Sequence, residues 1–479
     1  MIIKGKPSLH FNYNKSTLRK IRIFILLSLI LYVLGIHASK AMDLKTIIGL
    51  GLPVVDIITE NGEMPTCDIV AHPEGCVGQG ITNINKVRGR LRIHINDRIL
   101  YDSGDYLKDS TGITIRVRGN TSAAQDKKPY KIKLQKKADL LLRGDDDKYS
   151  DKEWVLIKDS PVTINTVIGL KINELMQMQW TPAYQFVNLM LNGDYRGIYL
   201  LIESVKRNNR CRLNVDKQTG YIIEYDPYWW NEEFYLETCF TELPVAKFTF
   251  KEPDPITDEL INSLKNTLDN LEITLFTNGY QEFIDIDSFA SWLLAQDILG
   301  NSDGHGSNVI MTKYDDNPQS KIKMANLWDF DAIMKTPGMF SNSRFALYFF
   351  VLMVHPDQIF ANAYREKWKS IGPTLVQEMK SCLSEFETSE IGRALDRSIP
   401  YDSERWNRKG DSLEELIDDA INWFEARKIW LDNNILTEEF TSFKGTYNLK
   451  GIKLTSPAKG VFIQNGKKWF VKHWAQSRM

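Results

Sequence analysis

The sequence predicts an α+β fold, with strands in the first half of the chain and helices in the second. Apolar and polar residues alternate in short segments between Leu52 and about Leu140, as they do in half-buried strands. From Thr257 onwards, apolar residues recur at helical spacing. The residues from 437 to 479 return to short alternating segments, so we expect a separate β-rich tail there.

The first forty-one residues have the layout of a secretory signal peptide. They contain seven Lys or Arg and no Asp or Glu. A basic segment from Lys15 to Arg22 precedes the apolar residues Ile23 to Ile36, and Ser39-Lys-Ala41 forms a small-x-small cleavage site. A membrane anchor is the alternative, but this apolar run is shorter than the roughly 20 residues that span a bilayer. We therefore expect an exported protein, located in the periplasm, at the cell surface or outside the cell, and not integral to the membrane after cleavage.

Charge and cysteine content limit the partners. Without the first forty-one residues, 53 of the 60 basic residues remain against 61 acidic ones, a formal charge of about −8. An acidic chain argues against nucleic acid as a partner.

The five cysteines have no C-x2-C spacing, which argues against a cysteine metal site; they are Cys67, Cys76, Cys211, Cys239 and Cys382. Disulfides are not obligatory, and we expect Cys67 with Cys76 as the first pair if any forms.

A first candidate site lies between two predicted strands. We expect strands at 53–59, 89–95, 112–118 and 127–134. The turn from Arg118 to Ser122 contains Gly, Asn, Thr and Ser, whose backbone N–H and hydroxyl groups suit an anion. In the following strand, Lys131 and Lys133 share one face and apolar residues the other. A strand lysine beside nucleotide phosphates fits this pattern; the alternative is a solvated strand face with ordinary lysines.

The next segment predicts a helix followed by a hairpin. Apolar residues recur at helical spacing from Asn165 to Met178, with Glu174 near the end of this helix. Two apolar runs flank Asn192-Gly193, a strong signal for a tight hairpin turn, and Glu203 closes the second run. Glu174 or Glu203 is the expected partner of a strand lysine, although Glu174 also reads as a surface residue of an amphipathic helix.

The densest group of candidate catalytic side chains lies between Asn301 and Asp331. Asp303 and Asn308 are five residues apart, and Asp329-Phe330-Asp331 follows. Protein kinases use the same order of side chains: an Asp that accepts the substrate hydroxyl proton, an Asn five residues later that holds metal, and a second metal-binding Asp. Hard oxygen ligands suit a metal that bridges phosphates. The alternative is that these are turn residues.

Local patterns place this group in loops. The apolar residues Phe289 to Leu299 predict a helix that ends at Gly300. Val309 to Thr312 predict a strand. The polar side chains therefore follow a helix and flank a strand.

The remainder of the chain is predicted to be helical until the tail. Pro253-Asp-Pro255 marks a linker, and we expect helices at 257–271, from 288 onwards, and at 344–352, 362–386 and 413–434. Tyr228-Trp229-Trp230 suits either stacking on a sugar or peptide or packing at the edge of a lobe. In the tail, Asn465-Gly466 predicts a hairpin turn.

Four ordered motifs resemble those of the CotH family of atypical kinases, especially exported members from Bacteroidetes-type bacteria. They are Arg118-Gly-Asn-Thr-Ser with Lys127-Lys-Pro-Tyr-Lys-Ile-Lys-Leu, Asn192-Gly-Asp-Tyr-Arg-Gly-Ile-Tyr-Leu-Leu-Ile-Glu203, Asn301-Ser-Asp-Gly-His with Asn308, and Trp328-Asp-Phe-Asp331. The resemblance runs from about Leu52 to Trp368. It implies a two-lobed, protein-kinase-like fold that transfers phosphate from ATP to Ser or Thr of extracytoplasmic proteins with Mg²⁺ or Mn²⁺.

The resemblance also implies residue roles. Asp303 matches the catalytic acid, and Asn308 and Asp329 match metal-binding positions, to which we add Asp331. The expected nucleotide-binding residues are Arg118, Lys128, Lys131 and Glu203, with Lys128 the first choice for phosphate. The sequence departs from the family where Leu327 precedes Trp328 and Lys323 stands in place of an upstream tryptophan, so the adenine contact is left open.

The expected organisation is a signal peptide at 1–41, a strand-rich segment at 42–110, a kinase-like N-lobe at 111–252, a helical C-lobe at 253–436 and a β tail at 437–479. Two functions remain as alternatives to a kinase. One is a non-catalytic adhesion or scaffold protein with the same fold, and the other is a metal-dependent phosphohydrolase. H-E-x-x-H, G-x-S-x-G and Walker A patterns are absent from the sequence.

Overall fold

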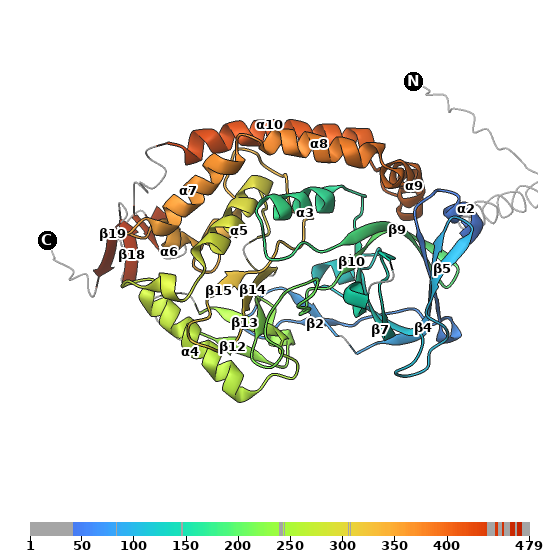
Figure 1. Ribbon diagram of the computed structural model, residues 1–479, viewed down its shortest axis with the longest axis horizontal. Helices are drawn as coiled ribbons and strands as arrows, with labels where there is room; N and C mark the ends of the chain where they lie inside the picture. The colour runs from blue at the N-terminus through green and yellow to red at the C-terminus, as the bar shows by residue number, and fades with distance from the viewer. Residues whose placement is uncertain are drawn as a thin grey trace, which may run out of the picture.

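The computed structural model describes residues 42–82, 84–144, 147–238, 243, 245–304, 306 and 308–437, together with four short strands of the tail. The expected signal peptide and Cys239 lie outside these residues. The fold is of the predicted α+β class (Figure 1). Within the described residues, none of the helices is both long enough and apolar enough to cross a membrane.

The larger sheet contains eight strands in the order β1-β9-β10-β8-β7-β6-β4-β5. Their bounds are β1 Val54–Thr59, β4 Val87–Ile95, β5 Arg98–Asp102, β6 Ile113–Val117, β7 Tyr130–Ala138, β8 Asp151–Lys158, β9 Tyr184–Leu191 and β10 Asp194–Glu203. β1 pairs in parallel with β9 and antiparallel with β4, so the sheet closes on itself. The predicted strands and the hairpin at Asn192-Gly193 correspond to β1, β4, β6, β7, β9 and β10.

Apolar side chains fill the inside of this closed sheet. Alternate residues of its strands point inward, as strand geometry requires, and form one buried cluster; it includes Ile57, Leu91, Ile115, Ile132, Trp154, Leu189 and Leu201. The opposite face of β6, β7 and β8 carries charged residues. The alternation read from the sequence therefore separates a packed interior from a polar outer face.

A second sheet has five strands in the order β12-β13-β11-β14-β15. The strands are β11 Tyr221–Tyr225, β12 Tyr235–Glu237, β13 Lys247–Glu252, β14 Val309–Lys313 and β15 Ile322–Met324. β14 and β15 belong to the stretch in which the catalytic side chains were predicted; β14 pairs with β11 from the preceding part of the chain, and β15 pairs with β14. The expected boundary at residue 252 therefore lies inside one folding unit.

Most of the helices lie on one side of the two sheets, whereas the helix of residues 258–274 lies on the other side of the five-stranded sheet (Figure 1). They are α2 Leu44–Ile48, α3 Asn165–Leu175, α4 Asp258–Thr274, α5 Ile286–Leu299, α6 Phe349–Met353, α7 Ile359–Ile371, α8 Leu375–Thr388, α9 Glu390–Trp406 and α10 Leu413–Ile435. Helix α5 is buried from Phe289 to Leu299. The core cluster around it joins α3, the five-stranded sheet and the C-terminal helices.

Helix α9 is absent from the sequence prediction. Pro400 lies inside it, and an interior proline normally ends a helical pattern. The helix packs on β10, where the Asp402 carboxylate accepts the Ile198 backbone N–H at 2.8 Å and pairs with Lys127 Nζ at 2.6 Å. Tertiary contacts thus hold a segment whose local pattern is weak.

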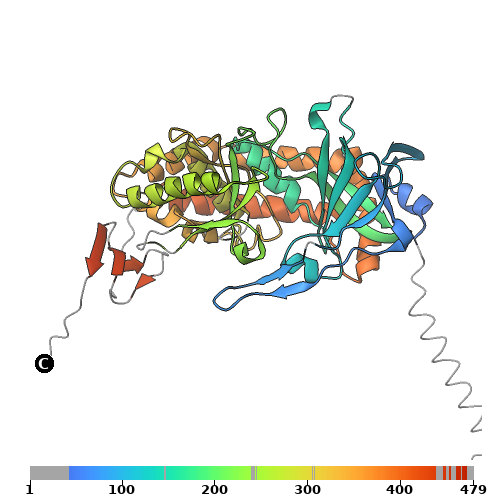
Figure 2. The ribbon, with the colours of Figure 1, turned by 90° about the horizontal axis from the view of Figure 1, so that it is seen from below.

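Two small sheets lie outside the main body. β2 (Ile69–Ala71) and β3 (Gln79–Ile81) form a projecting hairpin (Figure 2). In the tail, β16 (Thr446–Asn448), β17 (Lys453–Leu454), β18 (Gly460–Gln464) and β19 (Lys467–Val471) form a four-stranded sheet. The pairing of β18 with β19 agrees with the predicted hairpin.

Two expectations need correction. The boundary expected after residue 110 falls within the eight-stranded sheet, because β4 pairs with β6. The residues 42–110 therefore do not form a separate segment of the fold. Cys67 and Cys76 are both free; Cys67 precedes β2 and Cys76 lies in the loop between β2 and β3, and the pairing of these strands closes the hairpin.

Candidate functional site

A polar cleft of about 380 Å³ lies between the two sheets. Its volume is within the range of small-molecule sites. Most of the predicted site residues reach it; the charged and amide side chains that line it are Arg116, Arg118, Asn120, Lys131, Glu224, Asp226, Asn231, Glu232, Lys251, Asp303, Asn308, Asp329 and Asp331. Segments separated by more than two hundred residues therefore converge on one cavity.

One wall of the cleft is cationic and comes from β6 and β7. Arg116 is directly opposite Lys131 in the antiparallel pair, and Arg118 follows at the end of β6. Like charges facing each other across a strand pair are unfavourable. Burial lowers the pKa of all three side chains, which means that removal of water opposes their charge. An anionic ligand between the walls would offset this cost.

The turn after β6 adds hydrogen-bond donors to this wall. Gly119 has φ of +84°, a conformation that favours glycine, and a Cβ there would lie 2.4 Å from Ser122 Oγ. The backbone of residues 119–122 lines the cleft together with the side chains of Asn120, Thr121 and Ser122. The predicted anion-binding turn thus lies beside the predicted cationic strand.

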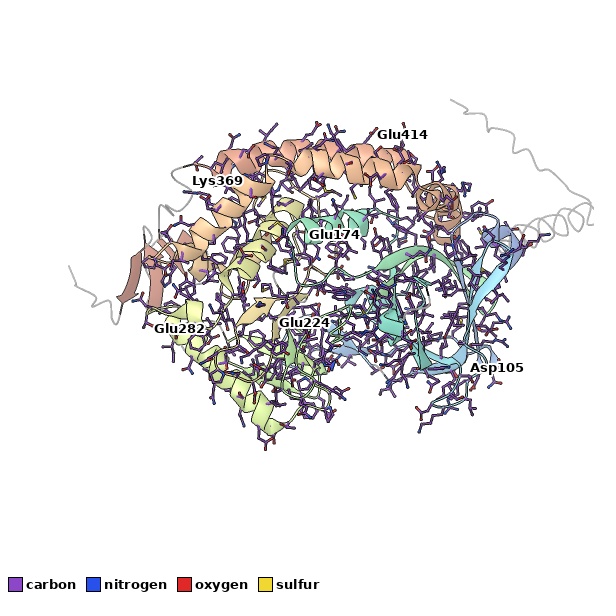
Figure 3. The ribbon with its side chains drawn as sticks, viewed as in Figure 1. Asp105, Glu174, Glu224, Glu282, Lys369 and Glu414 are labelled. Carbon is purple, nitrogen blue, oxygen red and sulfur yellow. The ribbon has the colours of Figure 1, made fainter. Side chains whose placement is uncertain are left out.

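The opposite wall is acidic and is built by the five-stranded sheet. Glu224 on β11 forms an ion pair with Lys251 on β13 at 2.5 Å, and its Oε1 accepts the Asn308 backbone N–H at 2.8 Å. The register of β11 against β13 shifts between Ile222 and Ile223, so a bulge contains Lys251. Bulges redirect side chains near functional sites. Figure 3 shows Glu224 near the centre of the molecule.

The sequence analysis missed Glu224 and Lys251. Glu224 lies in a mostly apolar strand and Lys251 in an alternating one, and a charged residue on a half-buried strand normally faces solvent. A usable signal was present, because Glu224 interrupts the apolar run Tyr221-Ile-Ile-Glu-Tyr. Although burial opposes the effect, the Lys251 ammonium lowers the pKa of Glu224, and Glu224 in turn raises the pKa of Lys251.

Asn308 and Asp329 meet in the cleft. Asn308 Nδ2 lies 3.5 Å from Asp329 Oδ2. Both residues have positive φ, at 78° and 64°, a strained backbone conformation that clusters at functional sites. The side chain of Phe330 packs on α3 where a Cβ at Gly169 would lie 2.1 Å from the ring, and Asn165 Nδ2 donates to Phe330 O at 2.9 Å. These contacts hold Asp329 toward the cleft.

Asp303 lies in the loop after α5. The helix ends at Gly300, which has φ of +56°, and Asn301 Oδ1 accepts the Asp303 backbone N–H at 2.9 Å. The Ser302 backbone N–H donates to Ala332 O at 3.1 Å, which joins this loop to the segment that carries Asp329 and Asp331. The two predicted acidic loops are therefore one connected structure.

Burial and charge repulsion shift the pKa values of two carboxyl groups in the cleft. Desolvation, together with Asp331 and Asp303, raises the pKa of Asp329 to about 7, against the opposing charge of Arg118. Burial and the neighbouring Glu224 raise the pKa of Asp226 to about 6. Carboxyl groups crowded in this way gain from a bound cation.

A smaller cavity adjoins the cleft behind Asp329. It shares Arg118, Ser122, Trp328, Asp329 and Asp331 with the cleft and is also lined by Lys158 and Asp159. Lys158, at the end of β8, has its pKa lowered by burial. Lys158 was not among the site residues predicted from the sequence.

Two predicted nucleotide-binding residues lie away from the cleft. Lys128 Nζ donates to the carbonyl oxygens of Ala123 and Gln125 at 2.8 and 3.2 Å. Glu203 is buried and pairs with Arg143 at 2.9 Å. Lys128 lies in the loop before β7 and Glu203 at the end of β10, and the side chains of both contact groups outside the cleft. Among the predicted nucleotide-binding residues, Arg118 and Lys131 line the cavity.

The other candidates have structural partners. Glu174 is exposed on α3, as its alternative interpretation predicted. Lys323 Nζ lies 3.7 Å from Asp285. Trp229 packs against Tyr235 with ring centroids 4.5 Å apart, whereas Tyr228 lines the cleft. The aromatic cluster therefore combines edge packing with one cleft-lining ring.

The donors in the cleft suit a divalent cation that is also bound by a ligand's phosphates. Asn308 and Asp329 supply adjacent oxygen-bearing side chains, with Asp331 nearby. Within the described residues, no three His, Cys, Asp or Glu side chains are arranged as a complete metal cage. Mg²⁺ in phosphotransfer sites typically uses one or two carboxylates plus substrate phosphates and water, so this donor set fits such an ion.

A cleft with cations on one wall and carboxylates on the other suits a phosphorylated ligand carrying a divalent metal. Residues 115–431 match the family model described as CotH kinase protein, and the chain belongs to this family. The crystal structure of the Helicobacter pylori proinflammatory kinase CtkA aligns with 77% of this chain and 97% of its own, at 11% identity and a TM-score of 0.27. No curated protein matches the chain.

Proposed function

We propose that this protein is an exported, metal-dependent kinase that transfers the γ-phosphate of ATP to Ser or Thr of extracytoplasmic proteins. The observation that carries the proposal is the convergence of Asp303, Asn308 and Asp329 with Arg118 and Lys131 on one cleft. Membership of the CotH kinase family supports it. Phosphoryl transfer depends chiefly on positioning and on charge stabilisation, and both requirements match this arrangement.

Each wall has a separate task in the proposed mechanism. Arg116, Arg118 and Lys131, with the backbone N–H groups of residues 119–122, bind and orient the triphosphate. Asp303 accepts the proton of the substrate hydroxyl and orients its oxygen toward the γ-phosphorus. The bond from the γ-phosphorus to the bridging oxygen breaks as the new bond forms, so ADP and a phosphorylated side chain result.

Asn308 and Asp329 would hold the metal, with Asp331 beside them. A bound Mg²⁺ or Mn²⁺ supplies positive charge to the phosphate oxygens. Glu224 supports this part of the site through its hydrogen bond to the Asn308 backbone. Lys251 keeps Glu224 ionised, since its ammonium lowers the pKa of that carboxyl.

Transfer of labelled phosphate tests the proposal. Purified protein is incubated with γ-labelled ATP and Mn²⁺, and autophosphorylation is compared between wild type and Asp303→Asn. We expect the variant to lose about 10²–10⁴-fold in rate, the usual contribution of a general base, with an unchanged unfolding midpoint. No incorporation by either protein would overturn the kinase assignment, and ATP consumption without labelled protein would indicate a phosphohydrolase.

Nucleotide binding separates a kinase from a non-catalytic scaffold. With metal present, a kinase should be stabilised by ATP in proportion to the logarithm of the ATP concentration over Kd. An adhesion or scaffold protein with the same fold should show no nucleotide-dependent shift in Tm. Arg118→Gln supplies the control, since it removes a cation from the cleft and should reduce the shift.

The export part of the proposal has its own test. The basic segment, apolar run and small-x-small site at the N-terminus predict cleavage after Ala41. Mass spectrometry of the protein recovered from the native cells should find a mature N-terminus at Met42. Recovery of the intact N-terminus from the cytoplasmic fraction would overturn this assignment.

A further inference from the structure

A second hollow, of about 850 Å³, lies on the eight-stranded sheet outside the cleft. Among the described residues, seven cationic and three acidic side chains line it, a marked excess of positive charge in a chain with formal charge −1. The cationic residues are Lys136, Lys137, Lys148, Lys152, Lys206, Arg207 and Arg210. We call this surface the basic hollow. The phosphotransfer mechanism uses none of these residues.

Ion pairs within the protein neutralise part of the positive charge of the basic hollow. The Asp151 carboxylate lies 3.2 Å from Lys206 Nζ and 3.5 Å from Arg212 Nη1. Lys136 and Lys137 are exposed, and among the described residues no carboxylate forms an ion pair with either of them. The register of β7 against β8 shifts between Lys133 and Ala138, so these two lysines lie in an irregular part of the strand. Such irregularity redirects side chains.

The basic hollow continues from the cleft along three chain segments. On β7, Lys131 lines the cleft and Lys136 lines the hollow. On β8, Val155 lines the cleft and Lys152 the hollow. After β10, residues 204–205 line the cleft and residues 206–207 line the hollow. Five residues of a strand span about 17 Å, so the hollow begins about five extended residues from Lys131 at the cationic wall of the cleft.

We propose that the basic hollow binds an acidic segment of the protein substrate, about five or more residues from the phosphorylated Ser or Thr. This inference rests on the proposed kinase function and adds a substrate class to it. Clustered Lys and Arg on a concave surface attract carboxylates and steer their approach. Asn208 and Asn209 also line the hollow and offer amide groups to a peptide backbone.

A peptide fits this surface better than a single-stranded nucleic acid. Nucleic-acid grooves combine positive charge with aromatic rings on which bases stack. None of the described residues that line the hollow is aromatic. The nearby Tyr149 ring is covered by Arg143 at 4.1 Å and by Lys148 at 4.4 Å, so it is not available for stacking.

Peptide binding tests the proposal independently of catalysis. The probe is a labelled peptide with a single serine and a run of glutamates about five residues away, and fluorescence anisotropy gives its Kd. We expect the Lys136→Glu/Lys137→Glu variant to bind about tenfold more weakly and to lose the salt dependence seen with wild type. Lys217→Glu/Lys409→Glu is the matched control, because both lysines are exposed outside the hollow, and it should bind like wild type.

Phosphorylation assays show whether the basic hollow acts on substrate binding or on catalysis. The Lys136→Glu/Lys137→Glu variant should raise KM for the acidic peptide about tenfold and leave kcat for a neutral serine peptide unchanged. Equal peptide binding by the variant and wild type would overturn the docking site. Tighter binding of an oligonucleotide of equal charge, lost in the same variant, would also overturn it. If the protein binds the acidic peptide through the hollow but transfers no phosphate, the proposed kinase function fails and the binding site stands.

Discussion

The two walls of the cleft reach opposite charge by different routes. The cationic wall comes from residues 116–131, where two neighbouring strands and their connecting turn bring Arg116, Arg118 and Lys131 together. The acidic wall is assembled from β11, β13 and two loops between residues 301 and 331. The cationic wall can be predicted from strand alternation because its residues are close in the sequence. The acidic wall cannot, because it depends on which distant strands pair.

The two walls also differ in how their charges are balanced. On the acidic wall, Glu224 has Lys251 as a close partner, but Asp329 and Asp226 have raised pKa values because they are desolvated and lie near other carboxylates. On the cationic wall, Lys131 pairs with Glu153 at 2.9 Å, while Arg116 and Arg118 lie beside it. The two walls thus present buried charge of opposite sign to the cleft, and a metal–nucleotide complex would bring a counter-charge to each.

The largest expected effect is a loss of stability when the buried ion pair behind the cationic wall is removed. Lys127, just before β7, pairs with Asp402 of α9, and both side chains are no more than 3% exposed. Asp402→Ala leaves a buried ammonium unpaired and should cost about 3–5 kcal/mol of unfolding free energy, measured by denaturant unfolding. Lys380→Ala breaks an exposed pair with Glu425 and should cost less than about 1 kcal/mol. Equal costs would show that α9 does not support this wall.

The second-largest expected effect is a loss of metal affinity when a carboxylate of the acidic wall is removed. Asp329→Asn should weaken Mn²⁺ binding in the presence of ATP by about 100-fold, or about 2.7 kcal/mol, because a ligand carboxylate is lost. Asp331→Asn should weaken it less, since Asp329 is the residue that contacts Asn308. Titration calorimetry measures both. Equal affinity in Asp329→Asn and wild type would remove Asp329 from the metal site.

A pH series examines the desolvation of the acidic wall. The folded-state pKa of Asp226 is raised to about 6, above an unfolded value of about 3.9. The folded protein therefore binds this proton more tightly, and wild type loses stability as pH rises from about 4 through about 6. Asp226→Asn does not titrate, so its stability relative to wild type should rise over that range by on the order of 2 kcal/mol. Unfolding midpoints at several pH values measure this difference, and a pH-independent difference would contradict the shift.

The smallest expected effect is a change in KM for ATP. It distinguishes Lys128 from Lys131, two lysines of the same sequence motif. Lys131→Met removes a cation from the cleft and should raise KM for ATP about tenfold, or about 1.4 kcal/mol. Lys128→Met should leave KM unchanged, because Lys128 donates to backbone carbonyls outside the cleft. Steady-state kinetics with both variants decides between them. The reverse result would place Lys128 at the phosphates, as the sequence alone suggested.

Most helices and strands were predictable because their signals are local. Alternation identified β1, β4, β6 and β7, and Asn192-Gly193 identified the hairpin of β9 and β10. The separate helices α7 and α8 were predicted as one, since only the short connection at residues 372–374 divides them. Helix α9 was missed because of Pro400. The closure of the eight-stranded sheet was not predictable, since it depends on a pairing of β1 with β4 and β9 that no local pattern encodes.

The sequence by itself determined the chemistry offered to the cleft: Asp303, Asn308 and Asp329 in kinase order, and the cations around Arg118. Only the tertiary structure decided which side chains face the ligand. It placed Lys131 in the cleft and Lys128 on the carbonyl oxygens of Ala123 and Gln125, and it added Glu224 and Lys251 through a bulge and the pairing of β11 with β13. The physical reason is that residue type and spacing are local properties, whereas side-chain direction follows from partner strands far away in the chain.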